Sequence, residues 1–228
     1  MKIIKTTILL LLSVITFAQE QTDMESFVNT LSTQSAIAET NAIRTFDNRY
    51  QGVDGHPYLL DQLKVLEVVT SNDSNHSVYG NYNLQDRLLV LLTKTNVLQN
   101  VPIDNIKSFS YTEGGIKSLF IKMDGTFVEA FFEGNNFSIF RSYSKELTKA
   151  DFKGAYSSGK NQDSFKTEID YRLSMNNTTQ KVKLNFSSLA EVLEKEEKKL
   201  KILAKENKLK IKKSEDLISI LKLFDETL

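Results

Sequence analysis

The sequence predicts an α+β fold: an antiparallel β meander of about eight to ten strands, strongly twisted or curled into a partial barrel, with C-terminal helices packed on one face. Two observations lead to this class. Between residues 51 and 186, short apolar runs, several of which alternate with polar residues, are separated by turn residues, as in antiparallel strands. From residue 187 onward, apolar residues recur at helical spacing. We therefore divide the chain into an export segment (1–18), an N-terminal helix and connector (19–50), a β domain (51–186) and a helical segment of the same domain (187–228).

The first eighteen residues have the parts of a secretory signal peptide. Lys2 and Lys5 precede an apolar run from Ile8 to Ile15, and Ala18 supplies a small residue at the expected cleavage site. The apolar run is about half the roughly 20 residues that a bilayer span needs, and no comparable run follows it. We expect an exported protein without a transmembrane anchor in its mature chain.

The composition excludes several classes of function. The chain has no cysteine, so disulfides, thiolate catalysis, sulfur-ligated metals and lipidation through a thiol are excluded. Its 29 basic residues balance its 29 acidic residues, which gives no long-range field to attract nucleic acid. We expect no cofactor and no nucleic-acid partner.

The elements before and within the β domain follow from local spacing. An amphipathic helix is predicted over Thr22–Leu31, and the glycines and proline of Gln51–Pro57 predict a turn. Arg87–Thr93 is apolar on both faces, as expected of a strand covered on both sides. Asp124-Gly125 predicts a tight hairpin. The predicted strands of this part are 63–70, 77–82, 87–93, 106–111, 116–123, 126–133 and 137–143.

A further hairpin is predicted around a turn at Asn176-Asn177-Thr178-Thr179. One face of its first strand is expected to be buried and the other wet, since apolar and charged residues alternate. Its second strand resumes the buried set. The expected buried residues are Phe165, Ile169, Tyr171, Leu173, Met175, Val182, Leu184 and Phe186, and the expected wet residues of the first strand are Lys166, Glu168, Asp170, Arg172 and Ser174.

The C-terminal segment predicts helices with a break. Ser188 and Glu191 have the spacing of a capping box, and the charged run Glu194–Lys199 predicts a break or a shift of face near Glu196. Lys208–Lys213 alternates and is predicted to be extended, and Ser214 is predicted as a second N-cap. The last helix should bury a stripe of Leu217, Ile220, Leu221, Phe224 and Leu228.

Several short motifs occur in a recognisable order along the chain. They are Gly52-x-x-Gly55-x-Pro57-Tyr58-Leu59, Asn81-Tyr82-Asn83 ahead of Leu88–Leu92, Phe137–Tyr143, and Asn207-Lys208-Leu209 to Asp216-Leu217. In this order the chain resembles a loosely defined group of exported proteins from Bacteroidetes, which carry a G-x-PYL segment, an (R)YN segment, a β meander and a Lys-rich helical C-terminus. The resemblance covers nearly the whole mature chain and implies an exported location and an order of structural elements.

The resemblance implies no catalytic residues, because no activity is established for that group. Where the group often has arginine before its Tyr-Asn pair, this chain has Asn81, so no role of that arginine carries over. Secreted proteins of that origin usually end in a β-sandwich sorting domain, whereas this sequence ends in a charged helix. The resemblance therefore favours the periplasm over the extracellular space.

The candidate catalytic residues each have an ordinary structural interpretation. His56 and His76 lack a second histidine at metal-ligand spacing, and Ser157-Ser158 lacks the glycine-flanked elbow of a serine nucleophile. Glu129 and Glu133 are expected on the same face of one strand beside aromatic residues. They would serve either as the two carboxylates of a glycosidase or as ordinary surface charges.

Two further features concern binding. The aromatic residues of the meander either fill a core or line a cleft for a lipid or acyl chain. The basic segment Lys195–Lys213 is interpreted as a solvated helix surface, because the whole stretch Ser187–Leu228 holds ten lysines against nine acidic residues. We expect a non-catalytic exported binding or accessory protein. The sequence does not identify its partner, and the candidates are an envelope protein or a hydrophobic ligand. The alternatives are a carrier of a hydrophobic ligand or lipid and, third, a glycan hydrolase using Glu129 and Glu133.

Overall fold

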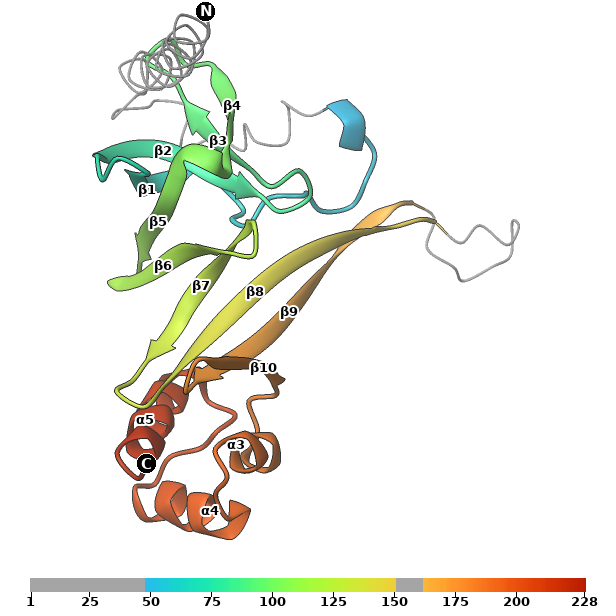
Figure 1. The fold of residues 1–228 in the computed structure, drawn as a ribbon. Coiled ribbons are helices and arrows are strands. Elements are labelled where there is room, and N and C mark those ends of the chain that lie inside the picture. Colours follow the sequence, from blue (N-terminus) through green and yellow to red (C-terminus); the bar gives the residue numbers. More distant parts are fainter. Residues whose placement is uncertain (1–47, 151–161) are drawn as a thin grey trace, which may run out of the picture.

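The computed structural model describes residues 48–150 and 162–228 of the chain. The predictions made for residues 1–18, for Thr22–Leu31 and for Ser157-Ser158 lie outside these ranges. Within them the fold is α+β, with one ten-stranded antiparallel sheet that is not closed, followed by three helices (Figure 1). The predicted fold class is confirmed.

Most strands agree closely with those predicted, with one addition. The last strand is shifted, since β10 begins at Thr178, inside the predicted turn, and ends at Val182, before Leu184 and Phe186. The unpredicted strand is β4, and β8 and β9 form a longer hairpin than expected. The 3₁₀ turns are η1 (Asn48–Tyr50) and η2 (Ile103–Asn105). The strands are β1 (Lys64–Thr70), β2 (Asn75–Asn83), β3 (Leu88–Leu92), β4 (Leu98–Pro102), β5 (Ile106–Glu113), β6 (Ile116–Met123), β7 (Thr126–Glu133), β8 (Phe137–Thr148), β9 (Ser164–Met175) and β10 (Thr178–Val182).

The strand order forces part of the sheet to curl. The order is β10-β9-β8-β7-β6-β5-β1-β2-β3-β4, so β4 and β5 are four strand spacings apart although only η2 joins them. Four spacings in a flat sheet amount to about 19 Å, whereas the chain from Pro102 to Ile106 spans at most about 14 Å. The segment β1–β5 must therefore curve into a partial barrel. Lys122 of β6 holds η2 in place, since its Nζ donates to Ile103 O at 3.1 Å and Asp104 O at 2.9 Å.

Aromatic side chains fill the interior of this partial barrel. Phe109 and Phe120 stack with their ring centroids 4.7 Å apart, and Phe127 meets Phe109 edge-on at 5.0 Å. Tyr82 packs against Phe127 at 5.4 Å and directs its hydroxyl to Thr126 Oγ1 at 3.2 Å. The four aromatic rings are buried together with aliphatic residues of β1 to β5.

A second core joins the helices to the other end of the sheet. The helices are α3 (Phe186–Val192), α4 (Glu197–Glu206) and α5 (Ser214–Asp225), and they gather at one end of the molecule (Figure 1). The sheet contributes Phe132, Phe137, Ile139 and Leu173, which are buried against the helices. Of the predicted α5 stripe, Leu217, Ile220, Leu221 and Phe224 are buried, whereas Leu228 is 41% exposed.

A β-bulge in β7 places both cores on the same face of the sheet. The register with β8 shifts between Ala130 and Phe132, so one extra residue lies on the β7 side. As a result Glu129 and Phe132 point to the same face, although their spacing in an unbroken strand would separate them. Glu133 points to the opposite face and is exposed. The prediction that Glu129 and Glu133 share a face is therefore wrong, because the bulge reverses the alternation.

The long β8–β9 hairpin extends beyond the neighbouring strands (Figure 1). Of the residues expected to be buried along β9, Leu173 is buried, but Ile169 is 47% exposed. The alternation correctly predicted a strand, but the expectation that its whole apolar face is buried was wrong. The far half of the hairpin lies past the helices that cover its near half.

The start of α3 differs from the predicted capping box. Asn185 is the N-cap, and its Oδ1 accepts from Ser188 N–H at 2.9 Å. The Ser188 hydroxyl instead accepts from Lys183 N–H at 3.0 Å. The predicted break near Glu196 is confirmed, since α3 ends at Val192 and α4 begins at Glu197.

Two smaller predictions for this region also change. Residues 207–213 form turns rather than an extended segment, and the N-cap of α5 is Lys213 instead of Ser214.

The turn between β7 and β8 docks on the end of α5. The buried carboxylate of Asp225 accepts main-chain N–H groups from Asn135 (2.7 Å), Asn136 (2.8 Å) and Phe137 (3.2 Å). A Cβ at Gly134 would lie 2.6 Å from this carboxylate, so the turn requires glycine there. This joint fixes the helical segment to the sheet.

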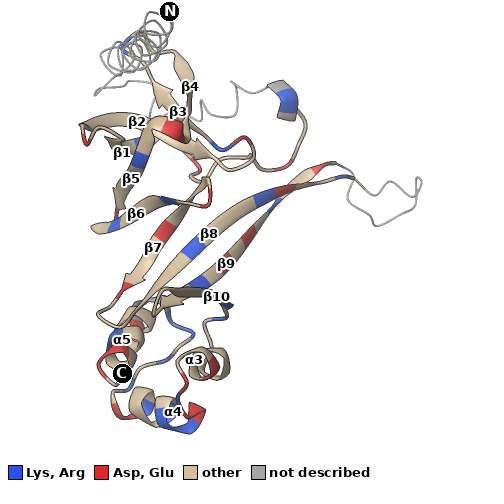
Figure 2. Cartoon of the chain, in the orientation of Figure 1, with Lys and Arg blue, Asp and Glu red and all other residues tan. Residues whose placement is uncertain are grey.

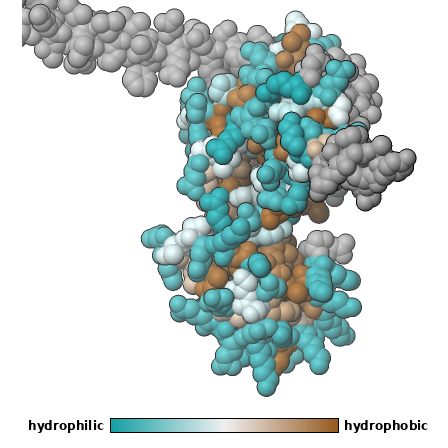
Figure 3. All heavy atoms as spheres, turned by 90° about the vertical axis from the view of Figure 1, so that its right-hand side faces the viewer, coloured by the Kyte–Doolittle hydropathy of each residue, from teal (hydrophilic) through white to brown (hydrophobic). Residues whose placement is uncertain are grey.

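The surface shows no large region of one charge sign over the part of the chain that is described. Lys and Arg alternate with Asp and Glu along β8, β9 and the helices (Figure 2). Hydrophilic residues cover much of the side shown in Figure 3, and apolar residues are visible between them. None of the helices in the described ranges combines the length and apolar character that crossing a bilayer requires.

Candidate functional site

The G-x-PYL motif forms a strap that crosses the outer side of the barrel. We define the strap as residues 55–63. Its main chain pairs with β2, since Leu59 N–H donates to Tyr82 O at 2.8 Å and Leu84 N–H donates to Pro57 O at 2.9 Å. Tyr58 forms an isolated bridge with Asn83. These bonds fix Tyr58, which is buried against Leu63 and Val90 in a small core of its own.

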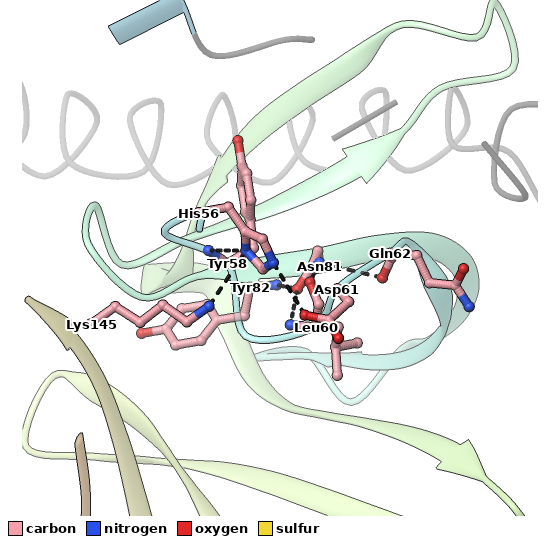
Figure 4. Close-up of polar contacts among 8 residues, drawn as sticks. All are labelled: His56, Tyr58, Leu60, Asp61, Gln62, Asn81, Tyr82 and Lys145. Atoms are coloured by element: carbon pink, nitrogen blue, oxygen red, sulfur yellow. Dashed lines mark hydrogen bonds and ion pairs between the residues drawn. The ribbon is translucent and has the colours of Figure 1, made fainter. Parts of the chain in front are cut away.

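Asn81 holds the strap by imitating a strand partner (Figure 4). Its Oδ1 accepts from Leu60 N–H at 3.0 Å, and its Nδ2 donates to Leu60 O at 2.8 Å. Since Asn81 is fully buried, this pair satisfies two main-chain groups that would otherwise lack partners. Asn81 therefore has a structural role, because it holds the strap against β2.

His56 links the strap to the long hairpin (Figure 4). Its Nδ1 accepts from Tyr58 N–H at 3.2 Å, which leaves the ring proton on Nε2, and Nε2 lies 3.2 Å from Asp61 Oδ1. Lys145 Nζ, from β8, lies 3.4 Å from the same Nδ1. Burial lowers the pKa of Lys145, and the nearby Asp61 carboxylate offsets part of this effect.

His56 does not combine with the other histidine into a metal centre. His76 lies in β2 opposite Val68. Across residues 48–150 and 162–228, no group of three or more His, Cys, Asp or Glu side chains has an arrangement that could hold a metal ion.

A surface cleft lies beside the strap, on the outer face of β3 and β4. Its volume is about 530 Å³. Three aliphatic side chains on the outer face of β3 and β4, Leu88, Val90 and Leu98, form the part of the lining that we call the apolar floor. The other lining side chains are Tyr58 and amide and charged groups. The lining residues are Arg49, Tyr58, Asn83, Asp86, Leu88, Val90, Leu98 and Asn100.

The polar rim of this cleft is fixed by hydrogen bonds. Asn83 Oδ1 accepts from the main-chain N–H groups of Gln85 and Asp86, both at 3.0 Å, and so closes the turn between β2 and β3. Asn83 Nδ2 donates to Asp86 Oδ2 at 3.0 Å, and Arg49 forms an ion pair with the same carboxylate. The two short motifs, which are separated in sequence, thus converge on the cleft through Tyr58 and Asn83.

Glu129 belongs to a separate network between the two cores. Its Oε2 accepts from Arg141 Nε and from the Tyr143 hydroxyl, both at 2.7 Å. The Arg141 guanidinium lies over the Phe131 ring at 4.6 Å, and Glu129 itself is 5% exposed. Burial, and next the charge of Glu129, raise the pKa of Tyr143 well above its ordinary value.

This network does not have the geometry of a glycosidase. Two-carboxylate hydrolysis needs one carboxylate on each side of a bound sugar, within about 5 to 10 Å of each other in one cleft. Glu129 is held by Arg141 and Tyr143, and Glu133 points to the opposite face of the sheet. The network instead ties β7 to β8 where the two cores meet.

A scan against protein-family models found no match to this sequence, and searches of curated proteins and of solved structures found no significant similarity either. The fold and the site define an α+β protein with a preformed surface cleft at one end of its sheet. The chemical character of that cleft therefore carries the functional argument.

Proposed function

We propose that the chain is a non-catalytic exported binding module and that the cleft beside β4 receives its partner. The observation that carries this proposal is the convergence of Tyr58 and Asn83 on one cleft. Both residues belong to short motifs noted in the sequence, Gly55–Leu59 and Asn81–Asn83. The Tyr58 side chain is held by its burial against Leu63 and Val90, and the Asn83 side chain is held by hydrogen bonds.

The character of the cleft supports recognition of a partner rather than chemistry. Leu88, Val90 and Leu98 provide an apolar floor, while Asn83 and Asn100 provide amide donors and acceptors at the rim. An apolar floor with a few fixed polar groups is the common composition of binding sites. The lining contains none of the histidine, serine or lysine groups from which nucleophile–base pairs are commonly built.

The two alternative functions receive less support. A carrier of a hydrophobic ligand needs an apolar cavity, and the barrel interior is occupied by Tyr82, Phe109, Phe120 and Phe127. A glycan hydrolase needs its two carboxylates in one cleft, which the bulge in β7 prevents. We retain the exported, periplasmic location as part of the proposal because residues 1–18 have the pattern of a signal peptide.

Capture from an envelope fraction tests the proposal. The full chain, Leu98→Lys and Ile116→Lys would serve as baits, and captured proteins would be compared by mass spectrometry. Leu98 lines the cleft, whereas Ile116 is 74% exposed in the β5–β6 region outside it, so both variants add the same charge. We expect a partner retained by the wild type and by Ile116→Lys but lost with Leu98→Lys. If Leu98→Lys captures the same proteins as the wild type, the cleft is not the binding site.

A further inference from the structure

Within residues 48–150 and 162–228, β4 has one edge along which no other strand pairs, and this edge lies beside the cleft. Among the described residues it pairs with β3 alone, and it is the last strand in the order of the sheet. Thr93 N–H donates to Val97 O at 2.9 Å, which fixes the alternation of the hydrogen bonds that follow. Gln99 and Val101 therefore bond to β3, while the N–H and C=O groups of Leu98 and Asn100 point outward.

Pro102 agrees with this assignment. It occupies the next outward position after Asn100, opposite Leu88. Proline has no N–H, so it is tolerated where that group would point away from the sheet. The outward row of β4 thus offers one N–H and one C=O from each of Leu98 and Asn100, whereas the Pro102 carbonyl belongs to the start of η2.

The two edges of the sheet differ in their protection. The other edge strand, β10, carries Lys181, which pairs with Asp170 of β9, and is followed by Lys183. Lysines on an edge discourage pairing with other strands. Residues 95–102, which include β4, contain no charged residue, and Val97 in this stretch is 57% exposed. The edge beside the cleft is the one that lacks this protection.

The cleft and the edge lie on adjoining sides of the same strand. Leu98 and Asn100 direct their main-chain groups to the open edge and their side chains to the cleft. A strand laid beside β4 would therefore place every second side chain next to the apolar floor. The two charged lining residues, Arg49 and Asp86, neutralise each other, so the cleft offers no net charge to a charged ligand.

We propose that the partner contributes an extended, uncharged polypeptide segment that adds to the sheet as a new strand along β4, with an apolar side chain at every second position in the cleft. This inference rests on the proposed function and specifies its ligand. Such strand addition takes affinity from main-chain hydrogen bonds and specificity from alternate side chains.

The test uses a linear peptide selected against the full chain from a random phage-displayed library. Asn100→Pro removes the outward N–H at position 100. Proline is already tolerated two residues later, at Pro102. Asn100→Ala is the matched variant, because it removes the same side chain but keeps the N–H. We expect the peptide to bind wild type and Asn100→Ala alike, and Asn100→Pro about tenfold or more weakly. Methylating the peptide's main-chain nitrogens one at a time should weaken binding at every second residue and leave the intervening residues unaffected.

Each alternative result has a distinct meaning. If Asn100→Pro binds the peptide normally and methylation shows no alternation, strand addition is overturned. If Leu98→Lys no longer binds the peptide in that case, the cleft is still supported as the binding site. If Leu98→Lys also binds normally, the proposed function fails as well. Should Asn100→Pro not fold, judged by its circular dichroism against Asn100→Ala, the methylation series on the wild type decides. Slow amide exchange at Leu98 and Asn100 in the unliganded chain would show that the edge is already covered, by the chain itself or a second copy, and would overturn the proposal.

Discussion

Replacing Asp225 with asparagine tests how strongly the joint between α5 and the β7–β8 turn stabilises the fold. The carboxylate accepts three main-chain N–H groups and is 5% exposed. Asparagine has the same shape, but its NH₂ group replaces one carboxylate oxygen. This NH₂ donor would face a main-chain N–H, which is also a donor. At least one charge-assisted hydrogen bond is therefore lost. Because such a bond contributes about 1.5–3 kcal/mol, we expect the free energy of unfolding to fall by about 2–4 kcal/mol at pH 7.

The effect of this substitution should depend on pH. Burial by itself would raise the pKa of Asp225, but the N–H groups of Asn135, Asn136 and Phe137 outweigh it and hold the pKa below its ordinary value. A depressed pKa stabilises the folded protein above the unfolded value of about 3.9, and this stabilisation is lost as pH falls through the folded value. Protonated Asp225 resembles asparagine, so the gap between wild type and variant should close between about pH 5 and pH 2.

Urea unfolding followed by circular dichroism measures this gap. Asp170→Asn is the matched control, since Asp170 pairs with Lys181 at the exposed surface, where such a pair contributes less than about 1 kcal/mol. The reasoning is refuted if Asp225→Asn costs no more than Asp170→Asn at pH 7, or if its cost is the same at pH 3 as at pH 7.

Three further substitutions test the strap and the buried network. Asn81→Ala leaves the N–H and C=O groups of Leu60 without their partner, so the free energy of unfolding measured in urea should fall by about 2–4 kcal/mol. A loss below about 0.5 kcal/mol would contradict the role of Asn81 in holding the strap. Glu129→Leu leaves Arg141 partly buried without its carboxylate, so the double variant Glu129→Leu/Arg141→Met should be more stable than Glu129→Leu alone, and equal or lower stability would count against the ion pair. Because burial, followed by the charge of Glu129, raises the pKa of Tyr143, Tyr143→Phe should not change the absorbance step at 295 nm near pH 10; a step smaller by one tyrosine would disprove this. Since this pKa is higher in the folded state, the contribution of Tyr143 to stability should be lost as pH rises above about 10.

Local signals predicted most of the secondary structure. Asp124-Gly125 marked the β6–β7 hairpin because its turn geometry depends on adjacent residues alone. The apolar stripe of α5 was visible because the helix buries one face. β4 was missed because Leu98–Pro102 is short, ends in proline and carries amides at its exposed positions. Leu98 and Val101 are separated by two amides, Gln99 and Asn100, so the segment lacks the period-two alternation that would distinguish a strand from a loop.

The features that decide function depend on distant residues. The pairing of β1 with β5 cannot be read from either strand, and it is this pairing that curls the sheet. The bulge in β7 has no glycine to reveal it, so Glu133 was assigned to the wrong face. The motifs Gly55–Leu59 and Asn81–Asn83 were noticed in the sequence, but their meeting at one cleft follows only from the strap's path over β2.

The central claim is that the cleft and the open edge of β4 together bind a partner. Amide hydrogen exchange at Leu98 and Asn100, measured with and without the captured partner, tests it most directly. We predict that both amides exchange rapidly in the chain alone and are protected by at least about tenfold on binding, while the already bonded amides of Gln99 and Val101 change little. Unchanged exchange at Leu98 and Asn100 with a bound partner would contradict the account.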